Sequence, residues 1–233
     1  MTPDLPRRLV AEGLGSLILV ATVVGSGIMG ARLSGGNDAL ALLANAIATG
    51  AMLVVLITIF GPLSGAHFNP VVTAIMAARR TLPARDMVPY IIAQIAGAIA
   101  GAMLANLMFD LPTVSIATTL RSGPAVWLSE AVATFILIGC ILGGLRHAPA
   151  SVPVLVGLTI TAAYWFTAST SFANPAVTIA RTFSDTFAGI SPASVCPFIA
   201  AQACGGAMGA LFWRWLFATP PQDGLQPCPI APR

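Results

Sequence analysis

Apolar positions in this chain fall into long uninterrupted stretches, and polar residues are confined to short connections. A bilayer core of about 30 Å takes roughly 20 apolar residues per helical crossing. Six stretches reach or approach this length, at about residues 9–29, 39–60, 88–109, 125–145, 151–166 and 197–217. The pattern predicts six membrane-spanning helices. We expect the first span to stay uncleaved, because its apolar run continues without a convincing small-residue cleavage site.

Two further apolar segments, residues 69–78 and 174–182, are too short to cross a bilayer. Each begins with an Asn-Pro pair, Asn69-Pro70 and Asn174-Pro175. Asn is a favoured N-cap, and Pro suits the first helical position, where its missing N–H is not needed. The sequence therefore predicts two re-entrant half-helices that begin at these pairs.

The two halves of the chain also match each other. Residues 88–109 align with residues 196–217, and the Asn-Pro boxes and the acidic first spans align as well. Each copy reads as span, span, half-helix, span, and three crossings invert the second copy relative to the first. We therefore expect an all-α membrane protein with six transmembrane helices and two half-helices in two inverted repeats. The expected layout is one channel domain over 1–233, with repeats at about 9–109 and 125–217 and an irregular tail at 219–233.

Composition removes several classes of function. Hydrophobic residues make up 57% of the chain and charged residues 8%, whereas an ordinary soluble domain carries roughly 25% charged residues. The eleven basic residues are all Arg and form no basic tract, so we expect no nucleic-acid partner. No catalytic constellation stands out, and the four cysteines lack metal-ligand spacing. We expect no enzyme activity, no metal and no cofactor, with the lipid bilayer and small neutral solutes as partners.

The arginines indicate an orientation. Eight of the eleven fall on the side that holds both termini, and only Arg32, Arg121 and Arg181 fall on the other. The positive-inside rule then places both termini in the cytoplasm of a multi-pass inner-membrane protein.

The loops before the two half-helices carry the candidate pore chemistry. An irregular backbone at membrane depth is tolerable only where its carbonyls face protein or water. The carbonyls of Gly65, Ala66 and His67 in the first loop, and of Thr170 and Phe172 in the second, are therefore expected to line a wet pore. Inversion brings the two half-helix N-termini together at the midplane, where their partial positive charge repels cations. The candidate midplane residues are Asn69, Pro70, Val71, Asn174, Pro175 and Ala176.

These motifs resemble the major intrinsic proteins, the aquaporin and aquaglyceroporin family, over nearly the whole chain. The likeness rests on Ala11-Glu12, the segment 64–71, Ala93-Gln94, Glu130 and Asn174-Pro175-Ala176. The resemblance implies a pore in each subunit and a homotetramer. It also implies that Glu12 and Glu130 support the loop backbones, a role that we extend to Gln94 and Gln202. The first box departs from the family pattern Asn-Pro-Ala by one small apolar residue, Val71.

The most informative departure from the family is Val177. Nearly all members carry Arg three residues after the second Asn, where it narrows the outer pore, so Val177 predicts a wider and less polar filter. Arg181 lies one helical turn further out, about 6 Å along the axis. Arg181 could supply a displaced positive charge, but we expect it to be exposed or snorkelling.

The remaining filter positions follow from spacing within the same resemblance. Thr49 stands where water channels usually carry Phe, which again favours width. The fifth-span position is Ala162 when counted back from Asn174, or Tyr164 when counted forward from Pro153 and Gly157. We favour Tyr164, since proline and glycine fix a helix register better than a loop does. The loop position is Ser171, with Phe172 as the alternative.

The expected function is a passive channel for small uncharged solutes. Candidates are glycerol-like polyols, water, and neutral metalloid hydroxides such as arsenite, because the Thr49 and Val177 pair resembles channels associated with bacterial arsenic-resistance operons. Two alternatives remain: a water-selective channel, and an ion-coupled transporter in which Glu12 and Glu130 relay protons.

Overall fold

The computed structural model describes residues 4–218, which form eight α-helices and three short 3₁₀ segments. The helices are α1 (Leu5–Leu33), α2 (Asp38–Ser64), α3 (Pro70–Ala78), α4 (Ala84–Met108), α5 (Pro124–His147), α6 (Val152–Phe166), α7 (Pro175–Ala180) and α8 (Val195–Leu216). The 3₁₀ segments are η1 (Pro149–Ser151), η2 (Arg181–Phe183) and η3 (Pro192–Ser194). The irregular tail expected at 219–233 lies outside the described residues.

Six helical segments are long and apolar enough to cross a membrane, which confirms the six predicted spans. The helices extend past the apolar windows at several ends. The first span begins at Leu5 because Asp4 caps it, accepting a hydrogen bond from the Arg7 amide, and Pro6 sits in its first turn. The second span continues to Ser64 and stops at Gly65, whose φ of 91° suits glycine. A polar N-cap and a glycine C-cap therefore set helix ends that hydropathy alone does not locate.

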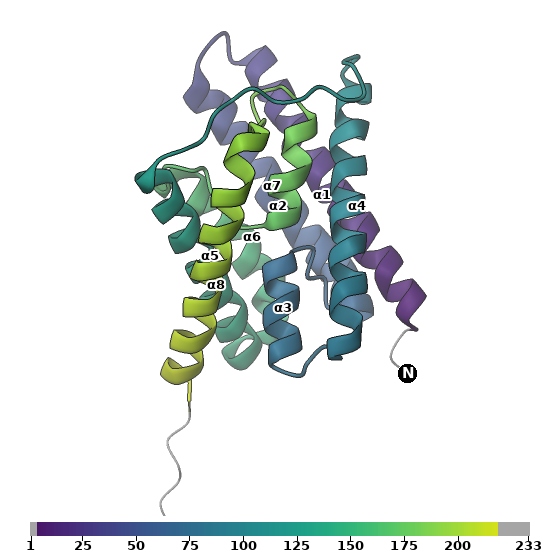
Figure 1. Ribbon diagram of the computed structural model, residues 1–233, viewed down its shortest axis with the longest axis vertical. Helices are drawn as coiled ribbons and strands as arrows, with labels where there is room; N and C mark the ends of the chain where they lie inside the picture. Colours follow the sequence, from purple (N-terminus) through teal and green to yellow (C-terminus); the bar gives the residue numbers. More distant parts are fainter. Residues whose placement is uncertain (1–3, 219–233) are drawn as a thin grey trace, which may run out of the picture.

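Helices α3 and α7 are the two half-helices, and each starts at its Asn-Pro pair as predicted. Asn69 accepts a hydrogen bond from the Val71 amide, and Asn174 accepts from the amides of Ala176 and Val177. The helices point in opposite directions from the middle of the molecule, with α3 in the lower half of Figure 1 and α7 in the upper half. Together they occupy the place of a seventh span.

The two repeats pack in the same way. In the first, α1 lies against α2 and α4, and in the second, α5 lies against α6 and α8, while α2 and α6 contact each other between the repeats. Repeat-related glycines allow the closest approaches. A Cβ at Gly97 would lie 2.0 Å from the carbonyl oxygen of Gly13, and one at Gly205 would lie 2.0 Å from that of Ala131. Small residues at such crossings let helix backbones pack closely in lipid.

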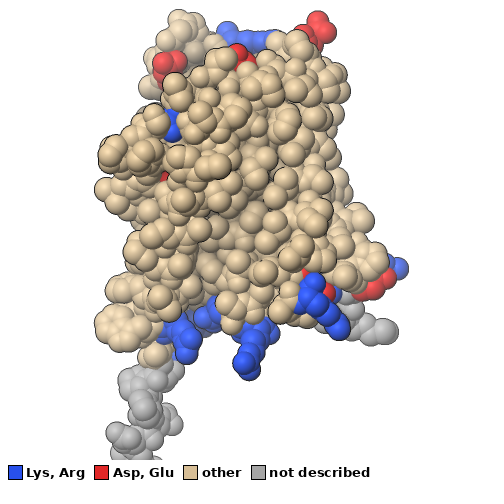
Figure 2. Space-filling model, in the orientation of Figure 1, with Lys and Arg blue, Asp and Glu red and all other residues tan. Residues whose placement is uncertain are grey.

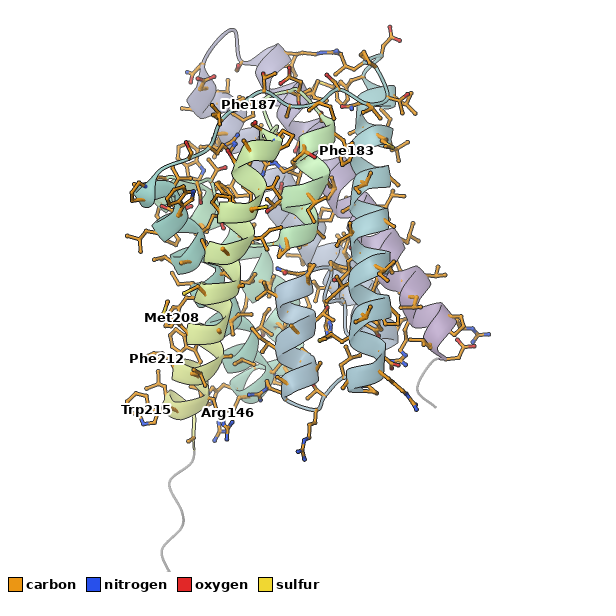
Figure 3. The ribbon with its side chains drawn as sticks, in the orientation of Figure 1. Arg146, Phe183, Phe187, Met208, Phe212 and Trp215 are labelled. Carbon is orange, nitrogen blue, oxygen red and sulfur yellow. The ribbon has the colours of Figure 1, made fainter. Side chains whose placement is uncertain are left out.

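The outer surface matches a lipid environment along most of its height. Charged side chains are concentrated at the two ends, and the arginines gather at the lower end, where α1 begins and α8 ends (Figure 2). Apolar side chains such as Met208 and Phe212 project outward between these ends, and Trp215 and Arg146 both lie at the lower end (Figure 3). An apolar belt bounded by an aromatic residue and basic groups is typical of a membrane-spanning protein.

Candidate functional site

A cavity of about 680 Å³ runs through the middle of the helix bundle. Arg85 and Asp86 line it at the end where α1 begins and α8 ends, Asn69 and Asn174 line it at mid-height, and Arg181 lines it beyond α7. These residues follow the cavity from one end at Arg85 and Asp86, here called the inner mouth, through the midplane to the end at Arg181, here called the outer end.

At the midplane the two Asn side chains form a crossed pair of hydrogen bonds. The Asn69 Nδ2 donates to the carbonyl oxygen of Ala173, and the Asn174 Nδ2 donates to that of Phe68, each over 2.7 Å. Each amide has a second N–H that this bond does not use. The expected neighbours at the midplane are buried behind the two Asn residues and do not line the cavity: Pro70, Val71, Pro175 and Ala176.

The loops before the half-helices have an irregular backbone, with left-handed φ values of 49° at Ala66, 48° at Phe68, 51° at Ser171 and 48° at Ala173. Of the expected carbonyl contributors, four line the cavity: Gly65, Ala66, His67 and Phe172. Thr170 does not, because it lies in the turn after α6, where its amide donates to the Thr167 carbonyl.

Two buried carboxylates hold these loops. Glu12 accepts from the amides of His67 at 2.9 Å and Phe68 at 2.8 Å. Glu130 accepts in the same way from the amides of Phe172 and Ala173, both at 2.9 Å. Each carboxylate thus satisfies two donors of a loop that has no regular secondary structure.

The glutamines complete this bracing. The Gln94 Nε2 donates to Glu12 at 2.7 Å and to Thr73 Oγ1 at 2.8 Å. The Gln202 Nε2 donates to Glu130 at 2.6 Å and to Thr178 Oγ1 at 2.9 Å. The two threonines were missed by the sequence reasoning, although the Asn-Pro-x-x-Thr spacing in both boxes carries the signal.

The first support cluster contains two further contacts. Ser64 donates to Glu12 at 2.6 Å, and the His67 Nδ1 lies 3.1 Å from Thr73 Oγ1. These contacts bind the end of α2, the loop and α3 into one unit.

Toward the outer end, the cavity wall combines hydroxyl and apolar groups. Thr49 and Tyr164 both line it, with their hydroxyl oxygens 3.3 Å apart, and Ser171 and Val177 line it as well. Ala162, the other candidate on the fifth span, is exposed on the outer face of α6. The structure thus places Tyr164 rather than Ala162 against the cavity.

The expectation that Arg181 is exposed or snorkelling was wrong. Only 2% of its surface is accessible, and its guanidinium carbon lies 3.5 Å from the centroid of the Phe172 ring. The Nε donates to the carbonyl of Ala188, in the loop that follows η2. Spacing along a helix shows which face a residue occupies, but not that a later loop encloses it.

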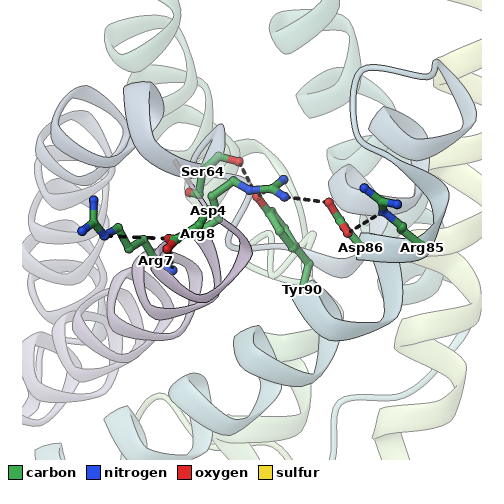
Figure 4. Close-up of polar contacts among 7 residues, drawn as sticks. All are labelled: Asp4, Arg7, Arg8, Ser64, Arg85, Asp86 and Tyr90. Atoms are coloured by element: carbon green, nitrogen blue, oxygen red, sulfur yellow. Dashed lines mark hydrogen bonds and ion pairs between the residues drawn. The ribbon is translucent and has the colours of Figure 1, made fainter. Parts of the chain in front are cut away.

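The inner mouth carries a partly buried ion pair that the sequence reasoning also missed. The Arg8 Nη2 lies 2.7 Å from Asp86 Oδ2, and the Arg8 Nη1 donates to the Tyr90 hydroxyl at 3.4 Å (Figure 4). Tyr90 in turn donates to the carbonyl of Ser64 at 3.0 Å. This network links α1, α4 and the end of α2, and through Ser64 it reaches Glu12.

Within residues 4–218 no group of three or more His, Cys, Asp or Glu side chains could hold a metal ion. Beyond the charged groups at the inner mouth, the polar lining of the cavity consists of amides, carbonyls, hydroxyls, the His67 imidazole and the Arg181 guanidinium at the outer end. Such a wall can exchange hydrogen bonds with a passing solute.

Comparison with known proteins gives a consistent result. Residues 1–171 match the family model of the major intrinsic proteins. The chain is 59% identical over 213 residues to the aquaglyceroporin AqpS of Rhizobium meliloti (strain 1021), covering 91% of each chain. It is 29% identical to aquaporin Z of Bradyrhizobium diazoefficiens, covering 92% of this chain and 95% of that relative.

A solved structure shows a similar fold. The X-ray structure of the aquaglyceroporin from Plasmodium falciparum superposes with a TM-score of 0.72 at 18% identity, covering 90% of this chain and 96% of that one. At this identity the likeness concerns the fold alone.

Proposed function

This chain belongs to the family of major intrinsic proteins, and from that premise we propose that it is a passive channel for uncharged solutes larger than water. Its family membership establishes that the chain is a multi-pass membrane channel for small solutes and not an enzyme. The solute range is the new part of the proposal. We assign to it glycerol-like polyols and neutral metalloid hydroxides such as arsenite, in addition to water.

One observation carries this range: Val177 lines the same cavity as the Thr49 and Tyr164 hydroxyls. Neither Val177 nor Thr49 has a long side chain that could reach across the cavity at this level. A polyol or a trihydroxide is wider than water and needs a passage without a constriction at this level. Its several oxygens can form hydrogen bonds with the Thr49 and Tyr164 hydroxyls. The similar protein from Rhizobium meliloti is named an aquaglyceroporin, which supports the same range.

The selectivity filter in this proposal consists of Thr49, Tyr164, Ser171 and Val177. The midplane consists of Asn69 and Asn174, whose second N–H groups replace water as hydrogen-bond donors to the solute. The carbonyls of residues 65–67 and Phe172 act as acceptors. Fixed donors and acceptors let an uncharged solute leave its hydration shell, while the two half-helix N-termini oppose cations.

We further propose an inner-membrane location with both termini in the cytoplasm. The described arginines at the end where α1 begins outnumber those at the other end, as the positive-inside rule requires of a cytoplasmic face. Each subunit of the proposed homotetramer would contain its own cavity, because every lining residue comes from one chain.

The ion-coupled alternative has less support in the geometry. Glu12 and Glu130 each accept two backbone amides and a glutamine amide, and they are completely buried away from solvent. Neither is among the residues that line the cavity. A proton relay needs carboxylates that contact the transport pathway, so we assign both residues to loop support.

The experiment that tests passive transport uses purified protein in liposomes, with uptake of glycerol and of arsenite at neutral pH measured against empty liposomes. Ionophores collapse the proton and sodium gradients in a parallel set. The proposal predicts uptake that is unchanged by the ionophores and proportional to solute concentration. Uptake that requires either gradient would favour the coupled transporter.

A further inference from the structure

The outer end of the cavity holds a cation without a carboxylate partner. Among the described residues no Asp or Glu oxygen lies within 4.0 Å of the Arg181 guanidinium, although the side chain is buried. A buried charge is costly unless something replaces its hydration. The contacts that replace it therefore indicate what this arginine is placed to do.

Two contacts hold the guanidinium in one orientation. Phe172 covers one face, with the guanidinium carbon 3.5 Å from the ring centroid, and the Ala188 carbonyl accepts from Nε. A ring face and a carbonyl are the partners of a cation–π stack and a charge-assisted hydrogen bond. Both contacts fix the plane of the guanidinium and leave its two terminal nitrogens unused.

The two terminal nitrogens of Arg181 have no hydrogen-bond partner within residues 4–218. Neither nitrogen is fully enclosed by protein, so both keep some accessible surface. Arg181 itself lines the cavity. Four N–H donors of a rigid planar group are thus presented to whatever occupies the outer end.

A second arginine secures the segment that supplies the Ala188 carbonyl. Arg121 donates through Nε to the carbonyl of Gly189 at 3.0 Å and through Nη2 to that of Phe187 at 3.4 Å. Its guanidinium carbon also lies 5.3 Å from the centroid of the Phe172 ring. The loop that orients Arg181 is therefore tied to the connection between α4 and α5.

From these contacts we infer that Arg181 is a specificity-determining residue of the channel, and that Phe172 is its positioning residue. The guanidinium donates hydrogen bonds to the hydroxyl or carbonyl oxygens of an uncharged solute at the outer end of the cavity, one helical turn beyond Val177. The Thr49 and Tyr164 hydroxyls offer further partners, and Val177 and the Phe172 ring supply the apolar wall. This inference rests on the proposed function and names the group that recognises the solute.

The test compares two solutes of similar size that differ in hydroxyl groups, glycerol and 1,3-propanediol, by stopped-flow light scattering on proteoliposomes. Arg181→Met keeps the length of the side chain and removes the donors, and Arg181→Lys keeps the charge and removes the planar fork. Arg79→Met, at an exposed arginine after α3, is the matched control.

Loss of a charged hydrogen-bond donor should lower the glycerol-to-propanediol permeability ratio at least about tenfold in Arg181→Met. The lysine variant should lower the ratio less and should keep the cation leak at the wild-type level, whereas the methionine variant should raise that leak. Water flux and elution from a sizing column report whether each variant still folds. If Arg181 had only a structural role, variants that pass both checks would keep the wild-type permeability ratio.

Phe172→Leu tests the stack without touching the donors, and it remains informative if Arg181→Met fails to fold. We expect it to lower the same ratio severalfold, because the guanidinium loses its fixed plane. Unchanged ratios in Arg181→Lys and Phe172→Leu would overturn the inference. Failure of the wild type to conduct glycerol would instead contradict the proposed function, so the two failures are distinguishable.

Discussion

The side-chain amide of Asn174 donates to the main-chain carbonyl of Phe68 at 2.7 Å, which joins the second half-helix to the loop before the first. The same side chain accepts from the amides of Ala176 and Val177 as the N-cap of α7. One residue therefore serves both as a helix cap and as a link between repeats at the midplane.

Asn174→Asp should separate these two roles. A carboxylate can still cap α7, but it cannot donate to Phe68 and it places a negative charge in the cavity. We expect the sodium permeability of proteoliposomes to rise at least about tenfold, given the Coulomb energies of partly buried charges. Asn37→Asp makes the same change at the exposed N-cap of α2 and should leave the sodium permeability at the wild-type level. Equal leaks in both variants would argue against charge exclusion at the midplane.

Glu130→Gln tests the support of the second loop. A glutamine has one acceptor oxygen, whereas Glu130 accepts from Phe172 and Ala173 through different oxygens, so one buried N–H would lose its acceptor. Such a group costs about 1–3 kcal/mol. The apparent melting temperature in detergent should fall measurably.

The control for Glu130→Gln is Asp110→Asn, at an exposed position with a left-handed φ of 58° that Asn also tolerates. Its melting temperature should stay at the wild-type value. A melting temperature of Glu130→Gln that matches this control would mean that the carboxylate does not brace the loop.

Arg8→Met tests the ion pair at the inner mouth. Asp86 is buried, with 4% of its side chain exposed, and it would lose its short contact to Arg8. Removing one partner of a fully buried pair costs about 3–5 kcal/mol. We expect a smaller cost here, because Arg8 is partly exposed and the Arg85 Nε stays 3.8 Å from Asp86. Arg7→Met removes an 80% exposed side chain, 3.8 Å from Asp4, and should change the melting temperature little.

Adding Asp86→Asn to Arg8→Met completes a double-mutant cycle. The double variant should recover part of the lost melting temperature, because it no longer buries a carboxylate whose remaining cation is the exposed Arg85, 3.8 Å away. Strictly additive losses would show that the two side chains do not interact energetically.

Val177→Arg tests the width of the filter. A guanidinium at this position would fill the outer cavity beside the Thr49 and Tyr164 hydroxyls, so the glycerol-to-water permeability ratio should fall by about tenfold or more. Val177→Met adds side-chain volume without charge, so comparing it with Val177→Arg separates the effect of size on the permeability ratio from the effect of charge. If the arginine variant keeps the wild-type ratio, Val177 does not limit the passage of glycerol.

The elements that could be predicted from the sequence are those with local signals. Six apolar runs gave six spans, and the Asn69-Pro70 and Asn174-Pro175 pairs gave the starts of α3 and α7 because capping needs only neighbouring residues. The support roles of Glu12 and Glu130 came from the family resemblance, and the structure places both against the loop amides.

The contacts that could not be predicted join segments far apart in the chain. Arg8 entered the sequence reasoning only as a charge that marks orientation, yet it pairs with a residue 78 positions away. Arg181 is buried because a loop that lacks regular structure folds over it and Phe172 stacks on it. Neither hydropathy nor helical spacing contains that information.

The measurement that tests the central claim most directly is the osmotic reflection coefficient of glycerol in proteoliposomes, taken from stopped-flow shrinkage and re-swelling of the same vesicles that report water flux. A passive channel wide enough for polyols predicts a coefficient well below unity, with re-swelling that is absent from empty liposomes. Rapid water flux with a glycerol coefficient of unity would identify a water-selective channel and contradict the proposed solute range.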